Sequence, residues 1–409
     1  MKKLIGTAVL AALVATSAFA EISFGAWLRT MIMPVSGDGD DVKAFMTNSW
    51  GNTIRPARLD ITGVTENEKA GMRLQFFPEN LQSDGMIGDN AYMWIKPWDW
   101  IRLTAGKFGD GDTGLRGDFA YGSWHWLRSF NGIRGDEGFT FSDIAGIGAR
   151  LELFPVEGLK IVAFVPYPQD ADKAYRVYEK TAVAAAYTIG DIGRVKAQWL
   201  GKFDEVDSTD GKNKYFGDIE VAFDLTAVEN LYLTVGAKIG IMDGNYYNKG
   251  SDPTYKLKEP KAAGPAEYEV DKKAGDPSLA ELAVVTLGAY YNIFDNFKIS
   301  LAGGVQFFNK IDGFEADPRW SIGLGLDYGL TDMLKLTADV RYISKLNYTE
   351  GGVEDVDDGV SFLVGIEHNF STNVLWGIGF EGVTNGHGFA GNLADGFAWA
   401  VPVKVQLFL

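Results

Sequence analysis

Charged side chains recur at every second position along several short segments of the chain. In the segment 334–342 (LKLTADVRY), Lys335, Asp339 and Arg341 alternate with apolar residues. Residues two apart in an extended strand point to the same side, so these charges share one face and the apolar residues share the other. Such a charged face can line a passage for water and hydrated ions.

The same alternation in other segments yields a set of candidate wall residues. A charged group in hydrocarbon is strongly disfavoured, so these faces must meet water or each other. They either form the wet wall of a channel or pair across strands to stiffen a sheet. The candidates are Arg58, Asp60, Arg73, Arg102, Arg150, Glu152, Arg194, Lys196, Asp218, Glu220, Lys298, Lys335, Asp339, Arg341 and Lys404.

Catalytic and metal-binding chemistry finds little support in the sequence. His occurs only at positions 125, 368 and 387, and the chain has neither an HExxH pattern nor any Cys. His387 has no Ser or Asp at a supporting spacing. The acidic runs at 38–41 and 350–358 could gather Ca²⁺, but they lack EF-hand spacing and are typical of solvated connections. We therefore expect no enzyme activity, no catalytic residue, no metal site and no cofactor.

The elements that carry these residues are short extended segments with a period near two. No helical period is convincing after the first 20 residues. Eighteen candidate strands can be read, at 21–32, 54–64, 69–79, 90–97, 100–108, 145–155, 158–166, 177–189, 192–202, 213–225, 228–241, 281–293, 296–308, 318–329, 331–346, 360–369, 371–384 and 396–409.

The connections between these strands alternate between short and long. Tight turns such as ENEK (66–69) and GDIG (190–193) are followed by longer polar connections. The longer ones include SGDGDDVKAF from Ser36, EGGVEDVDDG from Glu350 and the stretch 243–278. An antiparallel transmembrane barrel requires this alternation, an even strand number and both termini on one side. A soluble sandwich or solenoid of hairpins shares the strand pattern and stays open as an alternative.

Composition and the first residues narrow the class further. Residues 1–20 combine a basic start, an apolar run and a small-residue site at Ala18–Ala20, which predicts a secretory signal peptide cleaved after Ala20. No later stretch of 18 apolar residues exists, so a helical membrane protein is excluded. Fifty Gly residues, 13% aromatic residues and a mean hydropathy near zero are typical of a barrel wall. The net charge of −16 argues against a nucleic-acid partner.

Two further features fit a membrane barrel. The chain ends on AVPVKVQLFL (400–409), in which every second residue is apolar, so this strand is expected to be paired and covered on one face. Four aromatic residues flank the short turn near position 98, which predicts a belt at the membrane surface. These are Tyr92, Trp94, Trp98 and Trp100.

Taken with the signal peptide and the alternating hairpins, the chain resembles the bacterial outer-membrane porins over essentially all of residues 21–409. The resemblance is architectural, because no short motif carries it. It implies an all-β antiparallel barrel of 16–18 strands, best counted as 18, with short periplasmic turns and long extracellular loops. It also implies that the barrel-assembly machinery recognises the last strand. Porins usually end on Phe, whereas this chain ends on Phe408 followed by Leu409, so the aromatic residue is displaced by one position. A homotrimer in outer-membrane lipid is the expected assembly.

Porins fold a long third loop into the lumen, and the corresponding connection here is 109–144. Its Gly-rich sequence is unusually aromatic for a solvated loop, and its acidic and basic residues could set ion selectivity at a constriction. The aromatic residues either contact passing sugars or anchor the loop to the wall. The candidate constriction residues are Asp110, Asp112, Arg116, Asp118, Tyr121, Trp124, Trp126, Arg128, Arg134, Asp136 and Glu137.

The resemblance therefore implies a single-domain porin for passive diffusion of ions and small hydrophilic solutes. Two alternatives stay open: a porin selective for a sugar or an ion, and a surface adhesin built on a plugged barrel. The long extracellular loop 243–278 would carry the adhesin function.

Overall fold

The alternating segments form long antiparallel strands in the computed structural model of the chain, as their β-branched and aromatic residues favour. The structure describes residues 21–38, 41–48, 57–77, 87–109, 144–167, 179–208, 211–244, 246–248, 254–257, 268–272, 278–310, 315–348, 357–384 and 396–409. The strands are β1 (Glu21–Asp38), β2 (Asp41–Asn48), β3 (Ala57–Val64), β4 (Ala70–Phe76), β5 (Ile87–Trp98), β6 (Ile101–Phe108), β7 (Gly146–Leu153), β8 (Leu159–Pro166), β9 (Ala182–Ile189), β10 (Gly193–Ser208), β11 (Gly211–Leu225), β12 (Leu231–Met242), β13 (Tyr247–Asn248), β14 (Thr254–Leu257), β15 (Tyr268–Lys272), β16 (Ser278–Leu279), β17 (Glu281–Phe294), β18 (Phe297–Phe308), β19 (Arg319–Gly329), β20 (Leu334–Ile343), β21 (Gly359–Ser371), β22 (Val374–Thr384), β23 (Phe397–Ala400) and β24 (Val403–Phe408).

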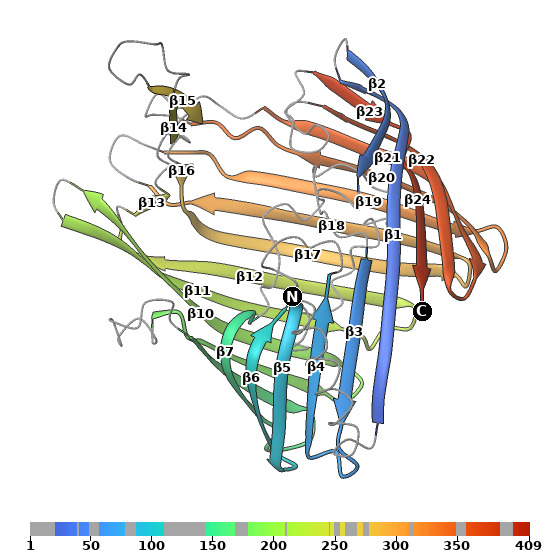
Figure 1. The fold of residues 1–409 in the computed structure, drawn as a ribbon. Coiled ribbons are helices and arrows are strands. Elements are labelled where there is room, and N and C mark those ends of the chain that lie inside the picture. The colour runs from blue at the N-terminus through green and yellow to red at the C-terminus, as the bar shows by residue number, and fades with distance from the viewer. Residues whose placement is uncertain are drawn as a thin grey trace.

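Twenty of these strands belong to one sheet that closes on itself (Figure 1). The first strand, β1, makes the closure: one of its edges pairs with β3 and β2, and the other pairs with β24 and β23. Because β2 and β3 share one position around the barrel and β23 and β24 share another, the sheet is an 18-stranded antiparallel barrel. The predicted fold class and the best strand count are confirmed.

Each of the eighteen predicted segments contains a strand, but two connections differ from expectation. The polar connection expected from Ser36 is wrong, because β1 continues to Asp38 and β2 starts at Asp41. In this segment Val42, Ala44 and Met46 are apolar at every second position, as in a strand. The neighbouring acidic residues obscure this alternation in the sequence. The stretch 243–278 contains short strands that form two small sheets, β13 with β16 and β14 with β15.

In β19 the outer face of the barrel wall is apolar and the inner face is polar. Ser321 and Asp327 point inward and are 4% and 7% exposed. The outward residues are each between 38% and 47% exposed, and they are Trp320, Ile322, Leu324, Leu326 and Tyr328. Trp320 packs against Tyr342, and Tyr328 against Phe297, so rings mark both ends of the apolar run. These ends are about 26 Å apart along the strand, which suits a tilted strand crossing a bilayer.

Two glycines allow close backbone approaches in the wall. Gly106 in β6 has φ +135°, and a Cβ there would lie 2.3 Å from the carbonyl oxygen of Ala91. Gly217 in β11 has φ +150° and lies beside a register shift in the pairing with β12. Among the described residues, no helix is long and apolar enough to cross a bilayer.

Candidate functional site: the inner wall of the barrel

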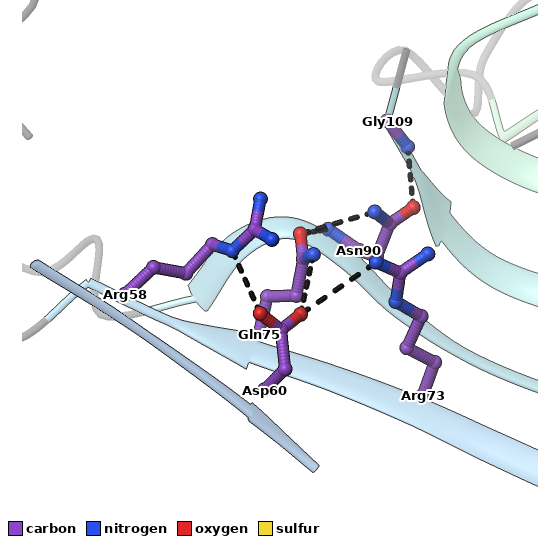
Figure 2. Close-up of polar contacts among 6 residues, drawn as sticks. All are labelled: Arg58, Asp60, Arg73, Gln75, Asn90 and Gly109. Carbon is purple, nitrogen blue, oxygen red and sulfur yellow. Dashed lines mark hydrogen bonds and ion pairs between the residues drawn. The ribbon is translucent and has the colours of Figure 1, made fainter. Parts of the chain in front are cut away.

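The first group of predicted wall residues surrounds Asp60 and is called the Asp60 cluster here. It comprises Arg58, Asp60 and Arg73 from β3 and β4 (Figure 2). Arg58 Nε donates to Asp60 Oδ2 at 2.7 Å, and Arg73 NH2 lies 3.6 Å from Asp60 Oδ1. One carboxylate is thus held between two guanidinium groups.

A chain of buried amides continues from this cluster to the end of β6 (Figure 2). Gln75 Nε2 donates to Asp60 Oδ1 at 2.6 Å, and Gln75 Oε1 accepts from the backbone N and Nδ2 of Asn90 at 3.1 and 3.0 Å. Asn90 Oδ1 then accepts from the Gly109 backbone N at 2.8 Å. Hydrogen bonds therefore link the Asp60 carboxylate to the point where the chain leaves β6.

The second group, the Glu152 cluster, comprises Arg102, Arg150, Glu152 and Lys160 from β6, β7 and β8. Glu152 Oε1 lies 2.8 Å from Lys160 Nζ, and Oε2 pairs with Arg102 Nε and lies 3.6 Å from Arg150 NH2. The Arg150 guanidinium also stacks 4.5 Å from the ring centre of Phe108. Three cations therefore surround the one carboxylate of Glu152.

The wall from β10 to β12 is balanced in charge. Lys196 Nζ lies 2.8 Å from Asp224 Oδ2, and Lys202 Nζ lies 2.6 Å from Asp218 Oδ2. The predicted residue Glu220 accepts a hydrogen bond from Gln198 Nε2 at 2.5 Å. Arg194 faces Asp224 in the β10–β11 register.

A second balanced segment spans β18 to β21. Asp327 lies 2.9 Å from Lys298 Nζ and 3.5 Å from Lys335 Nζ, and Lys335 lies 2.6 Å from Glu367. A cavity of about 490 Å³ opens beside Lys298 and Lys335 at the short-turn end. Arg341 Nε and Asp339 Oδ1 pair at 3.1 Å within β20. The remaining predicted residue, Lys404, is buried in β24.

Sequence reasoning missed several members of these clusters. Lys160, Asp327 and Glu367 lie on predicted strands at the correct parity, so the alternation could have identified them. Gln75 and Asn90 are neutral, and only the pairing register reveals their position between Asp60 and Gly109.

The predicted aromatic belt near position 98 is partly wrong. Trp98 and Trp100 are exposed and stack on each other at the turn, which fits a belt. Tyr92, however, lies on the inner face in an apolar cluster with Phe108 and Phe164, and Trp94 packs against it. The belt was inferred from rings that flank a short turn. All four positions have the same parity, so alternation alone does not separate the two pairs, and the register shift between Ile95 and Trp98 in the β5–β6 pairing does.

The predicted constriction residues lie outside the described part of the chain. They are Asp110, Asp112, Arg116, Asp118, Tyr121, Trp124, Trp126, Arg128, Arg134, Asp136 and Glu137. The predicted signal peptide, residues 1–20, also lies outside it. Within the described ranges, no group of three His, Cys, Asp or Glu residues is arranged to hold a metal ion.

Comparison with known proteins agrees with the geometry of the barrel. A family model described as Gram-negative porin matches residues 6–388. No curated protein matches the chain. An anion-selective porin from Comamonas acidovorans has 12% identity and a TM-score of 0.52, with 95% of this chain and 99% of that chain covered. In-vitro folded OmpT, an outer membrane protein of Vibrio cholerae, has 13% identity and a TM-score of 0.50, with 96% and 99% covered. At these identities the two structures show a shared fold.

Proposed function

Since the chain belongs to the Gram-negative porin family, it is an outer-membrane porin, and we propose that the inner wall described above lines its diffusion channel. The observation that carries the proposal is the division of the wall into an apolar exposed face and a charged inner face. Lipid would cover the outer face, and water with dissolved ions and small hydrophilic solutes would meet the inner one. An 18-stranded barrel is wide enough for an aqueous passage.

The proposal assigns ten of the predicted residues to the channel wall. Ion pairs hold all of these charged groups except Arg194 in fixed positions, so the wall would keep one charge pattern as solutes pass. These residues are Arg58, Asp60, Arg73, Arg102, Arg150, Arg194, Lys196, Lys298, Lys335 and Arg341.

The finer assignments also belong to this proposal. Residues 109–144 form the constriction, with the charged and aromatic residues named for it above, and 243–278 projects from the extracellular side. Residues 1–20 are removed after Ala20. The assembly machinery recognises the C-terminal strand, three copies associate in the membrane, and the protein has no enzyme activity. Family membership and the strand and turn pattern support these assignments.

Single-channel recording tests the proposal directly. The protein from Glu21 onward, refolded and inserted in a planar bilayer, should give discrete ohmic current steps in KCl. Heat-dependent mobility on a gel establishes beforehand that the barrel is folded. A folded barrel that gives no current would contradict the open channel and favour a plugged barrel acting through its extracellular loops.

A further inference from the structure

We propose that a hollow on the outer face of β5 to β8 binds one phosphate-bearing lipid of the extracellular leaflet, with an acyl chain in the hollow and the phosphate at Lys107. This site lies on the opposite side of the wall from the lumen, so it goes beyond the channel function and does not depend on an open passage. It depends on the membrane position of the barrel, which family membership supports.

The hollow, called the outer hollow here, lies where two alanines occupy the middle of one row across these neighbouring strands (Figure 1). The pairing places Ala105 opposite Ala149, with Met93 and Val165 at the two ends of the row. Met93 and Val165 are 68% and 38% exposed, so they stand above the alanines as two walls about 14 Å apart. Ala163 lines the hollow in the next row toward the short turns, and the volume is about 470 Å³.

A flexible acyl chain suits the outer hollow in size and in chemistry. Side chains around a void lose dispersion contacts on the open side, and a chain that fills the void restores them. A methylene group is close in size to a water molecule, which takes about 30 Å³, so the hollow has room for much of one acyl chain. Lipid tails are all as apolar as Leu, so the headgroup must decide which lipid is held.

Lys107 indicates the class of headgroup. It lies in the row next to the alanines, on the side of the long connections, and pairs with Ile147. Ile147 is 54% exposed on the outer face, and directly opposite residues share a face, so Lys107 also points outward. Within the described ranges, no residue forms a hydrogen bond or an ion pair with Lys107. An ammonium group on a lipid face is costly unless it reaches water or an anion, so it extends toward the headgroups.

The depth of Lys107 in the membrane matches the level of lipid phosphates. Trp100 marks the membrane surface at the short turn, and Lys107 follows it by seven residues, about 23 Å along the strand. This is close to the separation of the rings at the two ends of β19, so Lys107 lies near the extracellular surface of the bilayer.

Tyr167 provides a second donor at the same level. Its backbone N donates to the Ile147 carbonyl oxygen at 2.8 Å, which places it in the row of Lys107, and its side chain is 53% exposed. Lys107 and Tyr167 are two strand spacings apart, or about 10 Å between Cα atoms. One phosphate between their side chains would accept from both the ammonium group and the hydroxyl.

Native mass spectrometry of the refolded protein in detergent tests the site with two lipids that share their acyl chains. The probes are dioleoyl phosphatidylglycerol, which carries an anionic phosphate, and dioleoylglycerol, which lacks it. We expect the wild type to bind its first phosphatidylglycerol more tightly than dioleoylglycerol. Lys107→Gln should weaken phosphatidylglycerol binding by about threefold to tenfold, as expected for one cation near an anionic lipid, and leave dioleoylglycerol binding unchanged. Ala149→Phe fills the outer hollow and should weaken the binding of both lipids.

Lys310→Gln and Ala338→Phe are the matched controls. Lys310 is exposed outside the strands, and Ala338 lies opposite Leu326 on the outer face of β20, so both variants should bind lipid as the wild type does. Heat-dependent mobility on a gel establishes that each variant is folded. Equal effects of Lys107→Gln and Lys310→Gln, or of Ala149→Phe and Ala338→Phe, overturn the lipid site. Separation of associated copies by Ala149→Phe, with lipid binding unchanged, would assign the outer hollow to a second copy of the chain instead.

Discussion

At the scale of single residues, the contacts of Gln75 have the clearest consequence for stability. Gln75 is 1% exposed and bonds to both Asp60 and Asn90. Gln75→Leu would leave the buried donors of Asn90 without this acceptor. We expect it to lower the free energy of unfolding by about 1–3 kcal/mol. Urea unfolding of the refolded barrel, followed by tryptophan fluorescence, measures this change.

Gln306→Leu is the control for that prediction. Gln306 is only partly buried and donates a single hydrogen bond of 2.8 Å to Glu281. Its replacement should cost no more than about 1 kcal/mol. Equal losses from the two variants would mean that the bonds from Gln75 to Asp60 and Asn90 add nothing to stability.

The residue scale is also where sequence prediction reaches its limit. Alternation correctly placed Arg102 and Glu152 on one face of neighbouring strands. It could not show that three cations converge on Glu152, because that depends on which residues of β6, β7 and β8 lie opposite each other. Register depends on turn geometry and on pairing along whole strands, neither of which a local pattern contains.

At the scale of elements, the bulge in β11 depends on Gly217. Its φ of +150° is disfavoured for residues with a side chain, and a Cβ there would lie 2.1 Å from the Leu200 carbonyl oxygen. We expect Gly217→Ala to destabilise the barrel by about 1–3 kcal/mol, because the neighbouring backbone must move. Gly244→Ala is the control, since nothing lies within 4 Å of its added Cβ. A shift in the urea midpoint for both variants, or for neither, would contradict the prediction.

The segment after β12 is held to the barrel by Tyr246. The Tyr246 hydroxyl donates to Asp204 Oδ2 at 2.7 Å. The backbone carbonyl oxygen of Tyr246 accepts from Asn309 Nδ2 at 2.7 Å. Burial, with the hydrogen bond to Asp204 in addition, raises the pKa of Tyr246. Because the folded pKa is raised, the stability from the protonated hydroxyl is complete below about pH 10, the ordinary pKa of Tyr, and is lost as pH rises through the folded pKa.

Tyr246→Phe keeps the ring and removes this titration. At pH 8 we expect the variant to be less stable than the wild type by about 1.5–3 kcal/mol, the range for a hydrogen bond to a charged group. The difference should shrink as the pH rises above about 10. Urea unfolding of both proteins at pH 8 to 11 measures this difference in stability. The other tyrosines are present in both proteins, so their contributions to the pH dependence cancel. A difference that stays constant with pH would exclude this role for the hydroxyl.

At the scale of the whole molecule, the sequence was sufficient for the fold because the barrel repeats one simple rule. Each strand alternates apolar and polar residues, and successive connections alternate between short and long. One misassigned connection therefore does not change the predicted fold. The segment from Ser36 was misassigned as a loop, yet the strand count stayed correct because β2 lies on the same edge of β1 as β3. Both β2 and β3 pair with one edge of β1 because β1 is unusually long, and no local sequence pattern indicates that length.

The membrane position of the barrel gives the last prediction. Leu324 lies on the outer face of β19 midway between Trp320 and Tyr328, which places it near the bilayer centre. Leu330, in the turn after β19, is also exposed but lies at the membrane surface. Arginine on a lipid face costs about 2–4 kcal/mol at the midplane and about 0–1 kcal/mol near the interface.

We therefore expect Leu324→Arg to reduce the free energy of unfolding in lipid vesicles far more than Leu330→Arg. In detergent micelles, whose surface adapts around the charge, the gap should narrow. A large loss from Leu330→Arg in vesicles, or equal losses from both, would mean that the aromatic rings at the two ends of β19 do not mark the bilayer boundaries.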